Sequence, residues 1–354
     1  MKPFDEQANV SRGGARGVGA SSMVHFHPLV PEVIITSPEI HAMTDPIVVQ
    51  DLELEVNVWD DEPTTLFGRW YAHPEALEEI GGPAALLVCL PGGTYDHAYF
   101  DLDIPGDEYS FARWMAERGY VVLALDSLGT GRSTRPVAHE VGFAEMACAT
   151  AEAVAAIRER VPPGTPIVAV GHSMGGYHAV VQQAAVQTYD ALVVLGTTLG
   201  VVGIVPLPDE IVDAARSGPE ARAGLIDAMS ERFPEPYTSG DRSMLIEAFH
   251  AADVPEAVLA ADGEQTTTVV PRRASAESLV PWFASEAAAA VDVPVFLGYG
   301  EIDVSLDPHA EPAYFSGSDD VTLFVLRGSA HCHNMASTRH VLWERLEQWI
   351  GSVV

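Results

Sequence analysis

The chain has 354 residues, of which 47% are hydrophobic, so it is long enough and apolar enough to bury a core. Its 50 acidic residues outnumber the 19 lysines and arginines, the formal net charge is −31, and Lys2 is the only lysine. Binding to a nucleic-acid backbone or an anionic membrane surface requires clustered basic residues, so neither is an expected partner. The charge favours a small, neutral and apolar ligand instead.

Three cysteines, Cys89, Cys148 and Cys332, stand at unrelated spacings, so no disulfide framework is indicated. Residues 11–22 are small, polar and Gly-rich, which does not resemble a secretion signal. No segment reaches the roughly 20 continuous apolar residues that span a bilayer. We therefore expect a cytoplasmic protein without membrane association, and the sequence leaves open whether it forms a homo-oligomer.

The N-terminal segment has a composition typical of turns, and strand patterns begin after it. Residues 1–44 predict a flexible N-terminal arm. Residues 47–59 alternate apolar and polar side chains, which predicts a half-buried strand, and 68–72 predicts its antiparallel partner. Further along, apolar runs without alternation are typical of parallel strands covered on both faces, and they occur at 84–90, 121–125, 166–170, 191–195, 294–297 and 321–326.

Stretches with apolar residues at helical spacing alternate with these strands, which predicts an α/β fold with a mostly parallel, doubly wound sheet. The expected helices are 108–118, 140–160, 176–186, 308–315 and 339–350. A long interval between the strands at 191–195 and 294–297 contains helical patterns broken by prolines. We expect it to form a helical cap, 199–285, inserted between two parts of the core, 45–198 and 286–354.

The pentapeptide Gly171-His172-Ser173-Met174-Gly175 lies between a predicted strand and a predicted helix. This G-x-S-x-G pattern is typical of a sharp strand-to-helix turn that exposes a serine as a nucleophile. Glycines at both ends leave room for the neighbouring strand and helix, which side chains there would contact too closely. We therefore predict that Ser173 is a catalytic nucleophile.

A serine at neutral pH needs a general base, which in turn needs an acid to orient it. The loop after the last predicted strand offers His331 as the expected base, with His333 as the alternative. The loop after the preceding strand offers Asp303 as the expected acid, with Glu301 and Asp307 as alternatives.

The oxyanion formed on attack needs backbone N–H donors. Met174, directly after the serine, and Gly93, in the glycine-containing loop 90–97, are the expected donors, with Thr94 second to Gly93. Large side chains in the cap are expected either to contact the substrate or to form the cap's own core. The candidate substrate-binding residues are Thr94, Phe233, Tyr237, Phe249 and Trp282.

From about residue 45 to the C-terminus the chain resembles the α/β-hydrolase family. Residues 124–133 are similar to the family's D-x-x-G-x-G-x-S segment, in which Asp126 and Arg132 are expected to stabilise the loop, and the chain order Ser173, Asp303, His331 matches the usual order. Pro91 departs from the pattern, because many members have histidine there. The resemblance implies the α/β-hydrolase fold with a helical cap, no cofactor, and hydrolysis of an ester or lactone through an acyl-enzyme.

Within that family, residues 92–100 and 331–334 are similar to a bacterial branch that includes lactonases acting on the macrocyclic lactone zearalenone. Carbon–carbon bond hydrolases and acyltransferases use the same three residues, so they remain alternatives. A non-catalytic protein that binds a small ligand is an alternative of another class. A metal site built from His331, Cys332 and His333 is disfavoured, because neighbouring residues rarely converge on one ion.

Overall fold

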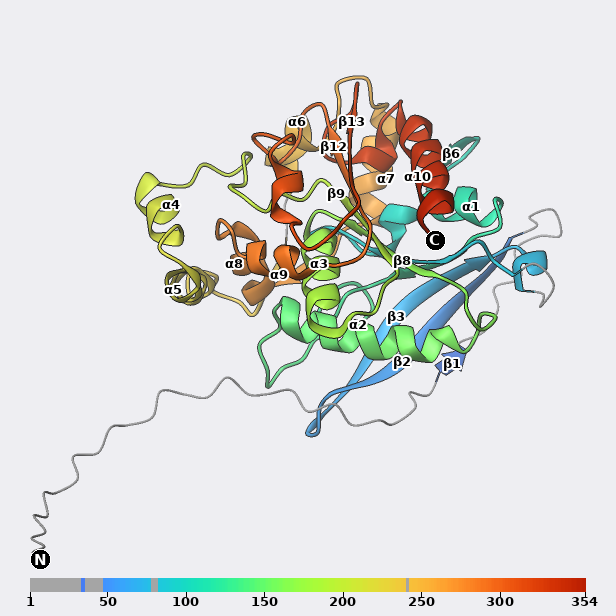
Figure 1. The fold of residues 1–354 in the computed structure, drawn as a ribbon, viewed down its shortest axis with the longest axis horizontal. Helices are drawn as coiled ribbons and strands as arrows, with labels where there is room; N and C mark the ends of the chain where they lie inside the picture. The colour runs from blue at the N-terminus through green and yellow to red at the C-terminus, as the bar shows by residue number, and fades with distance from the viewer. Residues whose placement is uncertain (1–32, 36–46, 78–81, 240–241) are drawn as a thin grey trace, which may run out of the picture.

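The computed structural model describes residues 33–35, 47–77, 82–239 and 242–354 (Figure 1). Most of the predicted arm, 1–44, therefore lies outside the described residues. Its described part, Val33–Ile35, is a short strand, β1, that pairs antiparallel with the following strand.

In the described residues, nine strands form one sheet in the order β1-β2-β3-β7-β4-β8-β9-β12-β13. The pairs from β1 to β7 are antiparallel, and all pairs from β7 to β13 are parallel. The predicted mostly parallel α/β sheet is thus confirmed. The strands after β1 are β2 (Val48–Trp59), β3 (Glu62–Ala72), β7 (Val121–Leu125), β4 (Leu86–Leu90), β8 (Ile167–His172), β9 (Ala191–Leu195), β12 (Val295–Gly300) and β13 (Val321–Leu326).

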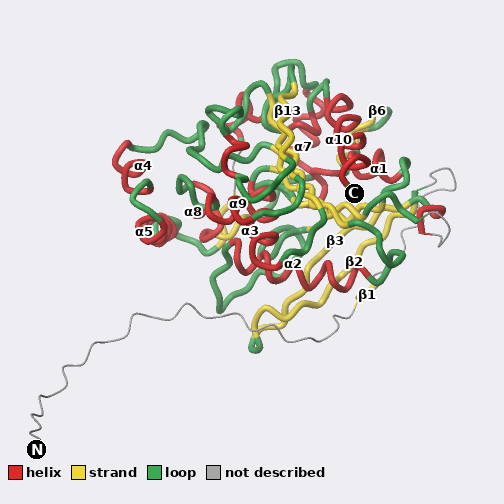
Figure 2. The backbone as a smooth tube through the Cα atoms, in the orientation of Figure 1, coloured by secondary structure: helices red, strands yellow, loops and turns green. Residues whose placement is uncertain are grey.

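Helices cover both faces of this sheet, as Figures 1 and 2 show. Leu86 and Val88 of β4 belong to the apolar cluster that also contains residues of α2 and α3. Leu87 and Cys89 of the same strand belong to the cluster with α1 and α10. Burial on both faces explains why these strands lack an alternating pattern. The helices are α1 (Phe111–Ala116), α2 (Phe143–Arg158), α3 (Met174–Val186) and α10 (Arg339–Val353).

Two predicted helices differ in the structure. The helix expected at 108–118 begins only at Phe111, because the Ser110 hydroxyl accepts a hydrogen bond from Arg113 N and so caps it. The preceding residues form strand β6 (Asp107–Tyr109), which pairs with β5 (Leu102–Ile104). The prediction of a helix at 308–315 is wrong, because only a 3₁₀ turn, η4 (Glu311–Tyr314), forms there. In a helix that began at residue 308, Pro312 would lack the N–H that bonds to the carbonyl oxygen of residue 308, and its ring would contact that carbonyl.

The interval between β9 and β12 holds two groups of helices. The first, α4, α5 and α8, has a small apolar cluster of its own and lies at one side of the molecule in Figure 1. The second, α6 and α7, contributes Phe249 and Val258 to the core cluster of α1 and α10. In chain order, the whole interval between β9 and β12 contains α4 (Asp209–Ala215), α5 (Pro219–Ser230), β10 (Tyr237–Ser239), η3 (Ser243–Leu245), α6 (Ile246–Phe249), α7 (Glu256–Gln265), β11 (Val269–Pro271), α8 (Arg272–Leu279) and α9 (Ser285–Ala290).

Candidate active site

Ser173 occupies the sharp turn between β8 and α3. Its backbone has φ 54° and ψ −117°, a combination that residues other than glycine rarely adopt. Neighbouring groups hold this turn: Ser173 N donates to Leu195 O at 2.7 Å, and Ser173 O accepts from Thr197 Oγ1 at 2.8 Å. The serine is therefore held in a strained but well-supported conformation.

The two glycines of the pentapeptide stand where a side chain has no room. A Cβ at residue 171 would lie 2.7 Å from Gly176 N, and one at residue 175 would lie 2.8 Å from Pro91 O. Both contacts are with backbone atoms, so no rotamer change relieves them. The sequence pattern thus has a local steric cause in this protein.

Ser173 and His331 line the same cavity, which has a volume of about 360 Å³. His331 comes from the loop after β13, and Ser173 from the turn after β8. Because the carboxyl ends of parallel strands meet at one edge of a sheet, these two residues, 158 positions apart, come to the same place.

Asp303, in the loop after β12, is bound by four hydrogen-bond donors. Its Oδ1 accepts from His331 Nδ1 and from Val304 N, each at 2.7 Å. Its Oδ2 accepts from Gly300 N at 2.7 Å and from His333 Nε2 at 3.0 Å. The carboxylate therefore contacts both the expected base, His331, and its alternative, His333.

The ionisation of Asp303 follows from these contacts. Burial alone raises the pKa of a carboxyl group, but the charge of His331 and the hydrogen bonds from both histidines outweigh it and hold the pKa of Asp303 well below its ordinary value. An ionised carboxylate only accepts, so His331 Nδ1 and His333 Nε2 both carry protons. In neutral His331 the proton-accepting atom is consequently Nε2.

A third histidine, His172, supports the loop that carries His331. His172 Nε2 donates to the carbonyl oxygen of His331 at 2.9 Å, and its ring stacks on Tyr99 at 4.5 Å between centroids. Burial lowers the pKa of His172 well below its ordinary value, and the charges of the two neighbouring histidines lower it further. His172 is thus a neutral donor that fixes the backbone beside the candidate base.

The expected oxyanion donors, Gly93 and Met174, also line the cavity. Met174 is the first residue of α3, where the N–H has no partner within the helix. Within the described part of the chain, no residue accepts a hydrogen bond from Gly93 N. Both N–H groups are therefore available to a bound oxygen.

The loop that carries Gly93 is held by the segment before β11. Thr94, which has a φ of 69°, accepts a hydrogen bond at its carbonyl oxygen from Thr268 N at 3.0 Å. Asp96 N donates to Thr266 O at the same distance. The guanidinium of Arg242 lies 3.9 Å from the centroid of the Tyr95 ring. Residues of the interval 199–285 thus hold the loop 90–97 as well as lining the cavity.

Of the predicted substrate-binding residues, Thr94, Phe233 and Phe249 line the cavity. Tyr237 and Trp282 do not, and both have other partners. The Tyr237 hydroxyl donates to Pro136 O at 2.7 Å, and Trp282 Nε1 donates to the hydroxyl of Tyr314 at 3.1 Å. We therefore do not assign these two residues to substrate.

Most of the remaining cavity wall carries no sequence signal. Arg242 is the one lysine, arginine or carboxylate residue among the described residues that line it. The rest are mainly aliphatic or hydroxyl side chains brought together from separate segments. They include Val202, Ile204, Val205, Leu245, Val270 and Leu279, and the hydroxyl residues Thr197, Thr198, Thr238, Ser275 and Ser278.

The alternative acids take part in other contacts. Glu301 is exposed and accepts from Gly328 N at 3.1 Å, and Asp307 is exposed and accepts from His309 N at 3.1 Å. Cys332 does not converge with its neighbouring histidines, because its sulfur lies 3.1 Å from the hydroxyl of Tyr95. Residues 331–333 therefore do not form one ligand set.

Ligand atoms of Asp96, His97 and Asp126 lie within 4.8 Å of one another. The carboxylate of Asp126 is already bound, because it accepts from the backbone N and Nδ1 of His97 and from Arg132 N. The side chain of Arg132 turns instead to Asp51. These bonds hold the loop together, which agrees with a stabilising role for Asp126.

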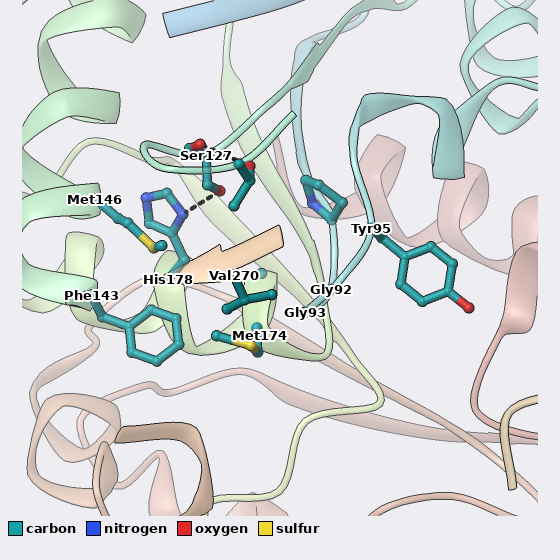
Figure 3. A pocket seen from close by; sticks show the side chains of 12 residues that line it. Gly92, Gly93, Tyr95, Ser127, Phe143, Met146, Met174, His178 and Val270 are labelled. Carbon is teal, nitrogen blue, oxygen red and sulfur yellow. Dashed lines mark hydrogen bonds between the residues drawn. The ribbon is translucent and has the colours of Figure 1, made fainter. Parts of the chain in front are cut away.

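Figure 3 shows a second serine–histidine pair, Ser127 and His178, beside a small cavity that Gly92 and Gly93 also line. Ser127 Oγ lies 3.2 Å from His178 Nδ1. The cavity measures only about 10 Å³, too little for an organic substrate. Burial lowers the pKa of His178 to about 4, so this histidine is a weak base. We therefore assign the pair to packing between α3 and the loop after β7.

A family model described as the alpha/beta hydrolase family matches residues 87–343, and the chain belongs to this family. No curated protein sequence matches the chain. Among the described residues, no helix combines the length and the apolar character needed to cross a membrane.

Solved structures with a similar fold include esterases and a lipase. A thermophilic esterase from Thermogutta terrifontis has 14% identity and a TM-score of 0.54, covering 85% of this chain and 98% of its own. A monoacylglycerol lipase from Paleococcus ferrophilus has 16% identity and a TM-score of 0.57, covering 82% and 99%. Est816, described as an N-acyl homoserine lactone degrading enzyme, has 15% identity and a TM-score of 0.51, covering 83% and 99%.

Proposed function

We propose that the protein hydrolyses carboxylic esters, including lactones, through an acyl-enzyme on Ser173. Ser173 Oγ attacks the carbonyl carbon, and His331 Nε2 takes its proton while Asp303 holds the imidazolium. The N–H groups of Gly93 and Met174 bind the oxyanion. His331 then gives the proton to the leaving alcohol. Water attacks the acyl-enzyme with His331 again as base, and the acid is released.

The observation that carries this proposal is that the strained Ser173 and His331 share one cavity, while His331 Nδ1 is bound to a buried carboxylate. The same contacts favour His331 over His333 as the base. His333 uses Nε2 for Asp303 and does not line the cavity, whereas His331 lines it and keeps Nε2 free of Asp303.

Substitution of the serine tests the mechanism. Ser173→Ala should lower kcat by about 10⁴ to 10⁶-fold and leave the fold intact, because it removes the group that forms the covalent bond. Ser275→Ala is the matched control, since Ser275 lines the same cavity without a proposed chemical role. A fluorophosphonate probe should label the wild type and the control but not Ser173→Ala. If Ser173→Ala keeps more than about a tenth of the wild-type rate, the proposal is wrong.

For the substrate we propose a bulky, neutral and mostly apolar ester or lactone, with a macrocyclic lactone such as zearalenone as the first to test. A cavity of about 360 Å³ with a largely aliphatic wall supports this, because such a volume suits a small organic molecule. The net charge of −31 disfavours anionic substrates during their approach. The lactone-degrading description of Est816, which shares the fold, is consistent with this choice.

The comparison to make is kcat/KM for zearalenone, a long-chain aryl ester and p-nitrophenyl acetate at fixed ionic strength. Each buried methylene contributes about 0.8 kcal/mol, so several of them should favour the larger substrates by more than tenfold. A clear preference for the acetate would disprove the large-substrate proposal and leave the serine mechanism untouched.

A further inference from the structure

Asp303 has two imidazole donors where the proposed mechanism uses one. His331 Nδ1 binds Oδ1 and His333 Nε2 binds Oδ2, at 2.7 and 3.0 Å. The side chains of Asp303 and His333 are each only 1% exposed. A second histidine is thus built into the site, away from the cavity that Ser173 lines.

His333 is not explained by packing alone. Its Nδ1 is buried and has no hydrogen-bond partner among the described residues. Burying an unpaired polar atom is unfavourable, so an apolar side chain of the same size would serve a purely structural role better. The atom of His333 that does have a partner is the one that faces the carboxylate. The feature this residue contributes is therefore its donor to Asp303.

We propose that His333 is a positioning residue that fixes the carboxylate of Asp303 so that Oδ1 faces His331. This rests on the proposed function. Without His333, Gly300 N is the one donor to Oδ2 among the residues that the structure describes, while Oδ1 keeps two. The torsion that rotates a carboxylate has broad minima, so an uneven set of donors holds its plane less well. His331 then loses part of its fixed orientation toward Ser173.

The second donor also disperses the charge of the carboxylate. With His333 absent, more of that charge acts on His331, which then holds its second proton more strongly. Among the described residues, the titratable groups that interact with Asp303 include His172, Tyr99, Tyr299 and Cys332. The charged residue Arg242 lines the cavity with His331, and its charge is the same in every variant. Burial raises the pKa of Tyr99, Tyr299 and Cys332 and lowers that of His172, so all four stay neutral near pH 7. Removing the donor should therefore move the acidic limb of the rate profile to higher pH.

Three substitutions separate the donor from the shape of the side chain. His333→Gln places an amide N–H near the position of Nε2, so it should keep most of the wild-type kcat and the wild-type pH profile. His333→Asn has a similar amide, but its nitrogen corresponds to Nδ1 and does not reach Asp303. His333→Leu has no donor. For Asn and Leu we expect kcat to fall about 10- to 100-fold, the scale of one hydrogen bond to a charged group, with KM within about twofold.

A double-mutant cycle with Asp303→Asn tests whether the effect passes through the carboxylate. In that background, His333→Asn should have little further effect on kcat. The inference is overturned if Asn and Gln variants behave alike in kcat and pH profile, or if His333→Asn costs as much with Asp303→Asn as without it. Should His333→Leu fail to fold, the comparison of Asn with Gln still decides the matter.

The same experiment distinguishes failure of the inference from failure of the proposed function. If a fluorophosphonate does not label Ser173 in the wild type and no ester is cleaved, the proposed function fails. If the wild type is labelled at Ser173 and active, and His333→Asn equals it, only the role of His333 fails.

Discussion

Replacing Gly175 by alanine should damage the fold and the site together. Gly175 is the second residue of α3, where the helix lies against the end of β4. A Cβ at this position would be 2.5 Å from the carbonyl carbon of Leu90 and 2.8 Å from Pro91 O, whereas real Cβ atoms essentially never come within 3.0 Å of a non-bonded atom of another residue. Both neighbours are backbone atoms, so α3 must move away from β4 as a unit.

The size of the effect follows from that rigidity. Overpacking a core usually costs about 1–3 kcal/mol, because side chains can still adjust. Here nothing but the backbone can adjust, so we expect the free energy of unfolding to fall by about 3–5 kcal/mol, out of a typical total of about 5–15 kcal/mol. Since α3 starts directly after Ser173, the same movement displaces this proposed nucleophile, and a misplacement of about 1 Å can cost 100-fold in rate.

Urea unfolding monitored by circular dichroism, with esterase activity measured in parallel, tests this expectation. Gly224→Ala is the matched control: Gly224 lies in α5, a Cβ there would meet nothing within 4 Å, and alanine should stabilise the helix by about 0.5–1 kcal/mol. If Gly175→Ala unfolds within about 1 kcal/mol of the wild type and keeps its activity, the steric reasoning is wrong.

Two further substitutions probe groups outside the site. Burial raises the pKa of Glu277 to about 7, although the hydrogen bond from Phe143 N and the charge of Arg273 act in the opposite direction. Glu277 therefore contributes to the stability of the fold below pH 4.5, and this contribution is lost as the pH rises through 7. Because glutamine cannot ionise, the free energy of unfolding of Glu277→Gln should rise relative to that of the wild type by about 3 kcal/mol between pH 4 and pH 8. A difference between the two proteins that does not change with pH would contradict this. Ser110→Ala removes the cap of α1, whose hydroxyl accepts from Arg113 N at 3.0 Å, and should cost about 1 kcal/mol in thermal or urea unfolding, while Ser110→Thr should restore most of it; equal stability of the two variants would argue against the cap.

Local sequence patterns predict much of the fold. The runs at 121–125 and 191–195 lack alternation because each strand is buried on both faces, and the structure places strands at those residues. The pentapeptide at 171–175 predicts a sharp turn because two glycines are needed where backbone atoms approach closely. By contrast, the helix expected at 308–315 failed, because the helical spacing of its apolar residues did not account for the missing N–H of Pro312.

The sequence by itself determined where the reactive residue types stand, because parallel strands end at one edge of the sheet and their following loops meet there. It did not determine which atoms face one another. His331 and His333 both reach Asp303, and only the packing of their loop shows that one offers Nδ1 beside the cavity and the other Nε2 away from it. In the same way Phe233 lines the cavity and Trp282 does not, since the direction of a cap side chain depends on residues far from it in the chain. The orientation of side chains across distant segments was decided by the tertiary structure alone.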